Sequence, residues 1–272
     1  MTRQFCIGPL TALALSPPRL MQAAARAGAD GIGVRMLPAA PGGMAHRLMD
    51  DPALLRETLA VKAATGMRIL DVEMVRIGPA FDLEPYRGFF ETAAALGAAH
   101  VLVAGDDPDE ARTAAAFARV CEALRPYRLT ADFEFMPWTA VRDLAAAKRI
   151  VAAAAQPTGG ILVDALHFAR AGCRLEELDN VPNAWLNYAQ ICDGPLIGPD
   201  TIEGLIHAAR CERGLPGEGE LDLPALFNRL PATAPICIET PSDTRAPLLG
   251  WDEWLRQAVV ASRQVLGAVA GR

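Results

Sequence analysis

The sequence lacks the cysteine spacing of a zinc knuckle or of a disulfide framework. It has six cysteines among 272 residues, and no two of them form a CxxC pair. Such scatter is typical of neither a structural metal site nor a disulfide-rich secreted domain. We expect most of these residues to be buried thiols that pack as small hydrophobic side chains. The six positions are Cys6, Cys121, Cys173, Cys192, Cys211 and Cys237.

The chain also lacks an excess of positive charge and any long apolar run. Its formal net charge of −6 gives no electrostatic footprint for nucleic acid or for an anionic membrane surface. No apolar run reaches the roughly 20 residues that a membrane-spanning helix needs. Near the N-terminus, Pro17 and Pro18 interrupt a modest apolar stretch, and no small-residue cleavage site follows it. We therefore expect a cytoplasmic protein that binds neither nucleic acid nor membranes.

A glycine motif for dinucleotides is missing too, because no GxGxxG follows the first strand-like run. Instead, apolar strand-like runs alternate with helical segments rich in Ala, Leu, Arg and Glu. Eight such units predict an α/β fold, a single (β/α)8 TIM barrel over residues 1–272, with a doubly wound open sheet as the alternative. The predicted strands are 5–8, 31–35, 68–73, 100–104, 129–134, 160–164, 185–192 and 236–239.

Polar side chains stand at or near the ends of the last four predicted strands. The run LTADFEFMPW carries Glu134 just before a proline, and a carboxylate buried in an apolar run is costly unless it is paired, hydrogen-bonded or bound to a metal. Because strand C-termini share one rim of a parallel barrel, where active sites are built, we expect these side chains to converge. The later runs contribute Asp164, His167, Gln190, Asp193 and Glu239.

Each of these residues also has a simpler explanation when it is taken alone. Glu134 suits an ion pair with Arg35 or Arg76, Asp164 suits a helix cap, and Glu239 suits a turn before a proline. Separate simple explanations for all three residues are together a weaker account than one shared site. Between the last two predicted strands, residues 194–222 form the longest irregular segment, which is typical of a lid or a binding loop.

Five motifs, EFMPW, DALH, QICD, PGEGELD and IETP, occur in this order on these runs. Together they resemble the xylose isomerase-like TIM-barrel superfamily of sugar phosphate isomerases and epimerases, over nearly the whole chain. The resemblance implies that Glu134, Asp164, Gln190 and Glu239 bind one divalent metal ion. The keto-sugar epimerase branch usually has histidine at the position of Gln190. Glutamine there, with the Glu-x-x-x-Trp and Asp-x-x-His patterns, is similar to bacterial 3-dehydroshikimate dehydratases.

Three carboxylates and an amide oxygen form an oxygen-rich site, which favours Mn²⁺ or Mg²⁺ over zinc or copper. Such a cation makes the C–H bond beside a substrate carbonyl more acidic. Glu134 and Glu239 are the predicted catalytic acid–base pair, and His167 is a third catalytic candidate. Return of the proton to the opposite face gives epimerisation, and its return to the neighbouring carbon gives isomerisation. Loss of a β-hydroxyl gives dehydration.

The predicted function is a metal-dependent isomerase or epimerase of a small keto-polyol or sugar, phosphorylated or not. A dehydratase of the 3-dehydroshikimate type is the alternative, and a non-catalytic sugar-binding barrel or subunit of a larger assembly is the second. The expected partner is a sugar- or cyclitol-like small molecule, and a homo-oligomer is compatible with the composition. The resemblance also extends to DNA-repair endonucleases, which have histidine-rich sites for three zinc ions. The four histidines of this chain are too few for such a site. The predicted substrate-binding residues are Glu73, Trp138, His167, Asp193 and Arg213.

Overall fold

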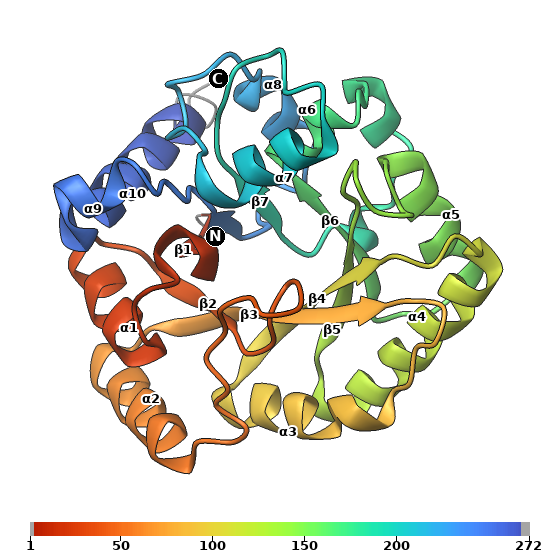
Figure 1. Cartoon of the computed structure of the whole chain (residues 1–272), viewed down its shortest axis with the longest axis horizontal. Coiled ribbons are helices and arrows are strands. Elements are labelled where there is room, and N and C mark those ends of the chain that lie inside the picture. The colour runs from red at the N-terminus through yellow and green to blue at the C-terminus, as the bar shows by residue number, and fades with distance from the viewer. Residues whose placement is uncertain (1–2, 268–272) are drawn as a thin grey trace.

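The computed structural model describes residues 3–267 and forms a closed barrel of eight parallel strands. Each strand pairs with the next in chain order, and β1 closes the barrel against β8. Figure 1 shows the strands at the centre with helices around them. The predicted (β/α)8 TIM barrel is confirmed. The strands are β1 Phe5–Ile7, β2 Gly31–Arg35, β3 Arg68–Ile77, β4 Ala98–Gly105, β5 Thr130–Glu134, β6 Gly159–Asp164, β7 Ala189–Ile191 and β8 Ile236–Ile238.

Most of the helices begin at a residue whose side chain caps the first turn. Asp51 accepts hydrogen bonds from two backbone N–H groups of α2, which ends at Gly66 with φ of 70°. Within residues 3–267, no helix is both long and apolar enough to cross a membrane. The helices are α1 Pro17–Arg26, α2 Pro52–Thr65, α3 Arg87–Leu96, α4 Glu110–Leu124, α5 Leu144–Ala154, α6 Ala165–Arg170, α7 Ile202–Cys211, α8 Leu223–Asn228, α9 Ala246–Leu249 and α10 Trp251–Gly267.

Three segments differ from the sequence predictions in extent. The seventh strand covers only Ala189–Ile191, because the chain before it forms a short 3-10 turn, Asn183–Trp185, that starts after Pro182. The third strand continues to Ile77, and its register against β4 shifts between Val72 and Val75. The segment 194–222 contains α7 and is therefore only partly irregular.

Apolar side chains fill both the barrel and the layer between strands and helices. Because successive strand residues point to opposite faces, Val101 and Val103 pack in the outer layer, whereas Leu102 packs inside the barrel with Leu70 and Leu162. This double burial explains why the strand runs are apolar throughout. All six cysteines are unpaired, and four of them are buried.

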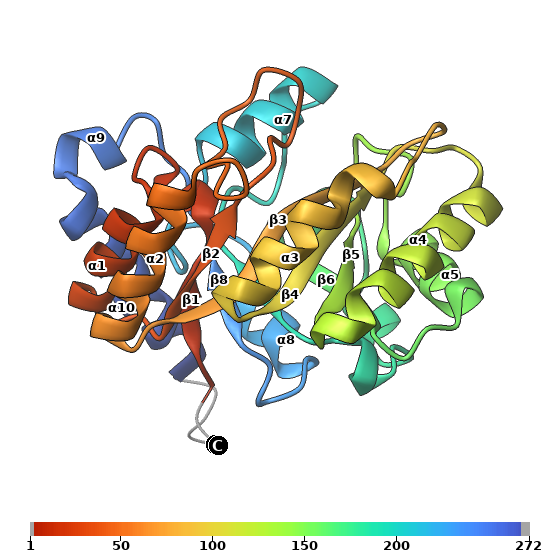
Figure 2. The same ribbon diagram turned by 90° about the horizontal axis from the view of Figure 1, so that it is seen from below.

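One end of the barrel is covered by segments far apart in the sequence. Figure 2 shows α7 and the loop 36–51 between β2 and α2 on the same side of the barrel, beyond the C-terminal ends of the strands. The long loops of the fold therefore gather where the polar strand ends meet.

Candidate functional site

The four predicted metal ligands meet at this end of the barrel. Glu134 and Asp164 are the last residues of β5 and β6, Gln190 lies in β7, and Glu239 directly follows β8. The pairing of β6 with β7 sets Asp164 opposite Gln190. None of the four is more than 5% exposed. A buried group of carboxylates needs compensating charge, so the surroundings of these oxygens determine what the site can hold.

The side-chain amide of Gln190 lies against two of the carboxylates. With its nitrogen facing them, it donates to Glu134 Oε1 at 2.9 Å and to Asp164 Oδ2 at 3.1 Å. With its oxygen facing them, three acceptors converge, an arrangement that a cation at their centre stabilises. Gln190 therefore suits both a cation-free site, as a donor, and a loaded site, as a ligand.

His167 joins this group from the first turn of α6. Its Nε2 lies 3.8 Å from Glu134 Oε1, and its backbone N–H donates to Asp164 Oδ1 at 2.9 Å, so that Asp164 also caps α6. The indole of Trp138 packs edge-on against the imidazole, with ring centroids 5.0 Å apart. Burial lowers the pKa of His167 to about 4, so its ring is neutral at physiological pH.

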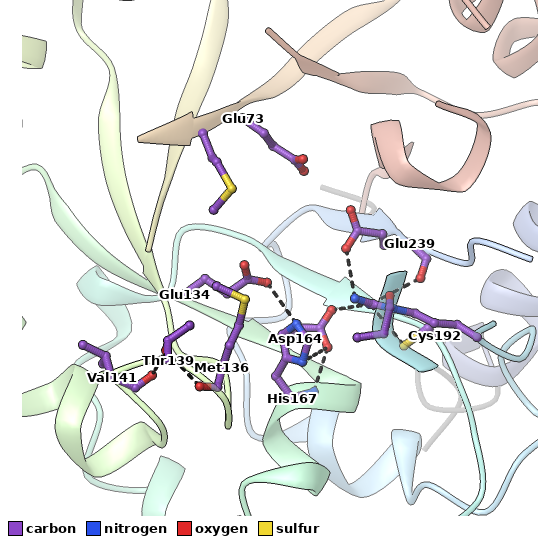
Figure 3. Close-up of polar contacts among 12 residues, drawn as sticks. Glu73, Glu134, Met136, Thr139, Val141, Asp164, His167, Cys192 and Glu239 are labelled. Atoms are coloured by element: carbon purple, nitrogen blue, oxygen red, sulfur yellow. Dashed lines mark hydrogen bonds and ion pairs between the residues drawn. The ribbon is translucent and has the colours of Figure 1, made fainter. Parts of the chain in front are cut away.

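Arg213 is the positive charge at the centre of the site. Its Nη1 donates to Asp164 Oδ2 at 2.6 Å, its Nη2 lies 3.4 Å from Glu239 Oε2, and its Nε donates to the carbonyl of Ala209 at 2.6 Å. Only 2% of its side chain is exposed. Figure 3 shows Glu239 beside Asp164, with His167 between Asp164 and Glu134. The arginine that the sequence predicts to bind substrate thus also joins the carboxylates of β6 and β8.

Glu73 lies across the site from Glu134, at the register position opposite Arg35. Its Oε2 accepts a 2.7 Å hydrogen bond from Arg35 Nε, while its buried Oε1 has no hydrogen-bond partner among the described residues. Arg35 therefore pairs with Glu73 and Arg76 with Asp106, so the simpler account of Glu134 as an ion-pair partner of either arginine is wrong.

Burial and mutual repulsion change the proton affinities of these carboxylates. Burial, followed by repulsion from Asp164 and Glu239, raises the pKa of Glu134 well above its ordinary value. Burial and Glu73 raise the pKa of Glu239 to about 8, although Arg213 opposes this. Burial also disfavours ionised Asp164, but Arg213 and then His167 outweigh it and hold the pKa of Asp164 below its ordinary value. Asp164 is thus the permanent anion, and the two glutamates are suited to proton transfer.

The donor set fits a divalent cation. Glu134, Asp164 and His167 bring ligand-type atoms within 4.8 Å of one another. Among the described residues, Glu239 Oε1 is a buried acceptor without a hydrogen-bond donor, and His167 Nδ1 is likewise unpaired. Buried polar atoms of this kind are those that a bound ion satisfies. Glu239 lies outside the 4.8 Å group and is joined to it through Arg213, whereas Gln190 contacts Glu134 and Asp164 directly.

Two other predicted substrate-binding residues have different surroundings. Trp138 lines the cleft beside His167, as a wall over a substrate requires. Asp193 is turned toward the segment 194–222, where its carboxylate accepts backbone N–H groups of Gly194, Gly217 and Leu221 at 2.8, 2.8 and 3.2 Å. In place of the substrate contact that the sequence predicts, Asp193 orders this loop.

Several residues of the cleft escape the sequence reasoning. Arg35 closes the second predicted strand, and its position at a strand end is a signal that could have identified it. Arg210 is a candidate from the sequence for contact with a phosphate or carboxylate, with a solvated loop arginine as the simpler account, and the structure places it in α7 at the cleft. Further lining residues are Leu10, Ala39, Met74, Arg76, Leu102, Met136 and Ala209.

The family model for xylose isomerase-like TIM barrels matches residues 21–264 of the chain. No curated protein sequence is matched by the chain. Among solved structures, the IolI protein with a bound zinc atom superposes with a TM-score of 0.80 at 19% identity, covering 99% of this chain and 100% of IolI.

Two further solved structures represent different reactions. A D-allulose 3-epimerase from Methylomonas sp., in complex with D-allulose, gives a TM-score of 0.69 at 16% identity, with 97% of each chain covered. The probable 3-DHS dehydratase AsbF from Bacillus anthracis, involved in petrobactin synthesis, gives 0.74 at 14% identity, covering 95% of this chain and 98% of AsbF. At such identities the likeness establishes the shared fold.

Proposed function

The chain belongs to the xylose isomerase-like TIM barrel family, and from this we propose that it is a divalent-metal-dependent isomerase or epimerase of a small keto-polyol or sugar. The observation that carries the proposal is the pair of buried glutamates, Glu134 and Glu239, which come from β5 and β8 and have raised pKa values. Two such carboxylates on one cleft supply a base and an acid for moving a proton at carbon. The D-allulose 3-epimerase among the structural neighbours supports this class of reaction.

Mn²⁺ or Mg²⁺ is the proposed cofactor, held by Glu134, Asp164, Gln190 and Glu239. When bound, the cation supplies Lewis acidity toward the carbonyl oxygen of the substrate. The oxygen-rich donor set favours these hard ions, although the IolI neighbour contains zinc and His167 would add a nitrogen donor.

In the proposed mechanism, one glutamate takes the proton from the carbon beside the carbonyl, and the other holds the proton that is returned. Burial raises the pKa of Glu239 to about 8, so its carboxyl group is largely protonated at neutral pH until a cation or substrate alters its surroundings. Glu73 lines the cleft, and its Oε1, which has no hydrogen-bond partner among the described residues, is the proposed acceptor for a substrate hydroxyl. Trp138 and Met136 line the cleft and help to exclude water.

The first test combines metal analysis with proton exchange. Purified protein should bind about one Mn²⁺ or Mg²⁺ per chain, and in heavy water it should catalyse exchange of the proton beside the carbonyl in keto-polyols. The variants E134Q and E239Q should each slow exchange by at least about 100-fold. E57Q, which changes an exposed glutamate of α2, is the matched control. A protein that binds no divalent cation and exchanges no such proton would refute the proposal and favour a sugar-binding barrel without activity.

A dehydratase is the second candidate, and Gln190 favours it. Glutamine at this position resembles the 3-dehydroshikimate dehydratases, and the likeness to AsbF supports the same class. In this reaction the carbanion formed by proton removal expels a β-hydroxyl, which leaves as water with a proton from the carboxyl group of Glu239, and the neutral ring of His167 hydrogen-bonds the departing oxygen. Ultraviolet absorbance from a conjugated product, formed in the presence of Mn²⁺ or Mg²⁺, would identify the dehydratase. Epimer or aldose formation without such absorbance would identify the first candidate.

A further inference from the structure

Arg210 lines the cleft from the last turn of α7, and its side chain is only partly exposed. It forms no hydrogen bond or ion pair through its guanidinium with any residue in 3–267. The other three arginines of the cleft each have a carboxylate partner, namely Glu73 for Arg35, Asp106 for Arg76 and Asp164 for Arg213. Arg210 is therefore the cleft arginine whose charge the described residues leave unmatched.

The surroundings of Arg210 make this unmatched charge unfavourable. Burial lowers its pKa, and the nearby positive charges of Arg76 and Arg35 lower it further, although Cys211 and the carboxylate of Asp106 oppose this in part. A guanidinium removed partly from water beside two like charges is destabilised unless an anion joins it. A bound anion would therefore lower the electrostatic energy of the Arg210 guanidinium.

The charged groups of the cleft lie at two depths. The side chain of Arg76, which lies near Arg210, is 29% exposed, whereas those of Asp164 and Glu239 are 0% and 4% exposed. Asp164 and Glu239 therefore lie deep in the barrel together with Arg213, whereas Arg76 and Arg210 lie nearer the solvent. A substrate with a carbonyl at one end and an anion at the other matches this polarity, which fixes the direction in which it enters.

We propose that Arg210, assisted by Arg76, forms a subsite for an anionic group of the substrate, either a carboxylate or a phosphate. The planar guanidinium donates two parallel hydrogen bonds to either group. This inference rests on the proposed function, because it assigns the anion to the molecule whose carbonyl faces Glu134 and Glu239. It makes Arg210 a specificity-determining residue that selects acidic or phosphorylated keto-polyols over neutral sugars.

The subsite is tested by calorimetric titration of the Mg²⁺-loaded protein with two probes, inorganic phosphate and cyclohexanecarboxylate. The variant R210M removes the charge at similar length, R210K keeps the charge without the fork, and R56M changes an exposed arginine of α2 as a matched control. At least one probe should bind, and R210M should weaken it by about 10- to 100-fold, as expected for loss of hydrogen bonds to a charged group. The affinity of R210K for the probe should lie between the affinities of R210M and the wild type. R56M should bind the probe as tightly as the wild type. The probe whose affinity falls in R210M shows whether the subsite binds a carboxylate or a phosphate.

Equal affinity of R210M and wild-type protein would overturn the proposal, because it would place the anion elsewhere, for example on the cation. Failure of both probes to bind wild-type protein would overturn it as well. Cation binding is measured separately, so the two proposals can fail independently. Anion binding that needs Arg210 in a protein without divalent-cation affinity supports the subsite and refutes the metal-dependent function. Proton exchange in neutral keto-polyols that R210M leaves unchanged, with anion binding also unchanged, supports the function and refutes the subsite.

Discussion

Arg213 donates a 2.6 Å hydrogen bond to Asp164, and the two side chains are only 2% and 0% exposed. A buried ion pair of this kind contributes little net stability, but removal of one member leaves an uncompensated buried charge. Here the same guanidinium also faces Glu239. The charge balance of the whole site therefore depends on this one residue.

Replacement of Arg213 by Met should destabilise the metal-free protein by about 3–5 kcal/mol, because ionised Asp164 loses its buried countercharge. The free energy of unfolding in urea measures the effect, with R56M as the control. Added Mn²⁺ should restore part of the loss, since a cation held by the same carboxylates supplies positive charge. An unfolding midpoint of R213M equal to that of the wild type would contradict this role for Arg213.

Glu239 should make the metal-free protein less stable as the pH rises. Its pKa is about 8 in the folded protein and near 4.5 in the unfolded chain, so the folded state binds more protons between these values. Stability from this group is fully present below pH 4.5 and is lost as the pH rises toward 8, with a slope of at most about 1.4 kcal/mol per pH unit.

The variant E239Q should flatten this slope without abolishing it, because the raised pKa of Glu134 acts in the same direction. Urea unfolding at a series of pH values measures the slope, and E57Q should behave as the wild type. A slope that E239Q leaves intact would mean that Glu239 is not the titrating group.

His167 should remain neutral well below the pH at which a free histidine gains a proton. Burial lowers its pKa to about 4, so the imidazole carbon resonance should not shift between pH 7 and about 5. The variant H167Q identifies the resonance by its disappearance. A titration midpoint near 6.5, the ordinary value, would show that the ring is open to water.

Asp193 should hold the segment 194–222 in place. Replacement by Ala removes the acceptor for three backbone N–H groups and should cost about 1–3 kcal/mol, because those groups lose their partner. Limited proteolysis should cut this segment faster in D193A than in the wild type. D200A changes an exposed aspartate in the same segment and should leave the cutting rate unchanged.

The barrel was predictable because apolar runs and capping residues repeat at each strand–helix unit. The exception is the seventh strand, where the buried side chains of Leu186 and Tyr188 precede the residues that pair. An apolar pattern reports burial, whereas a strand also requires backbone hydrogen bonding, and here Asn187 turns its side chain to Asp132 at 2.7 Å. In this segment the side chains of Leu186 and Tyr188 are buried, but the strand pairing of the backbone starts only at Ala189.

For the site, topology alone predicts that Glu134, Asp164, Gln190 and Glu239 share one rim, because parallel strands end together. The inward direction of Arg213 was not predictable from any local pattern. It depends on the path of the chain after α7, where Gly214 pairs with Asp193 and the backbone N–H of Arg213 donates to the carbonyl of Pro241. Contacts of this kind depend on tertiary structure, and no periodicity in the sequence reports them.

Asp164 divides its two oxygens between local architecture and chemistry. Oδ1 accepts the backbone N–H of His167 at the start of α6, while Oδ2 accepts the guanidinium of Arg213. One carboxylate therefore fixes both where a six-residue helix begins and where the guanidinium lies. A substitution at Asp164 cannot alter the charge of the site without also releasing the first turn of α6.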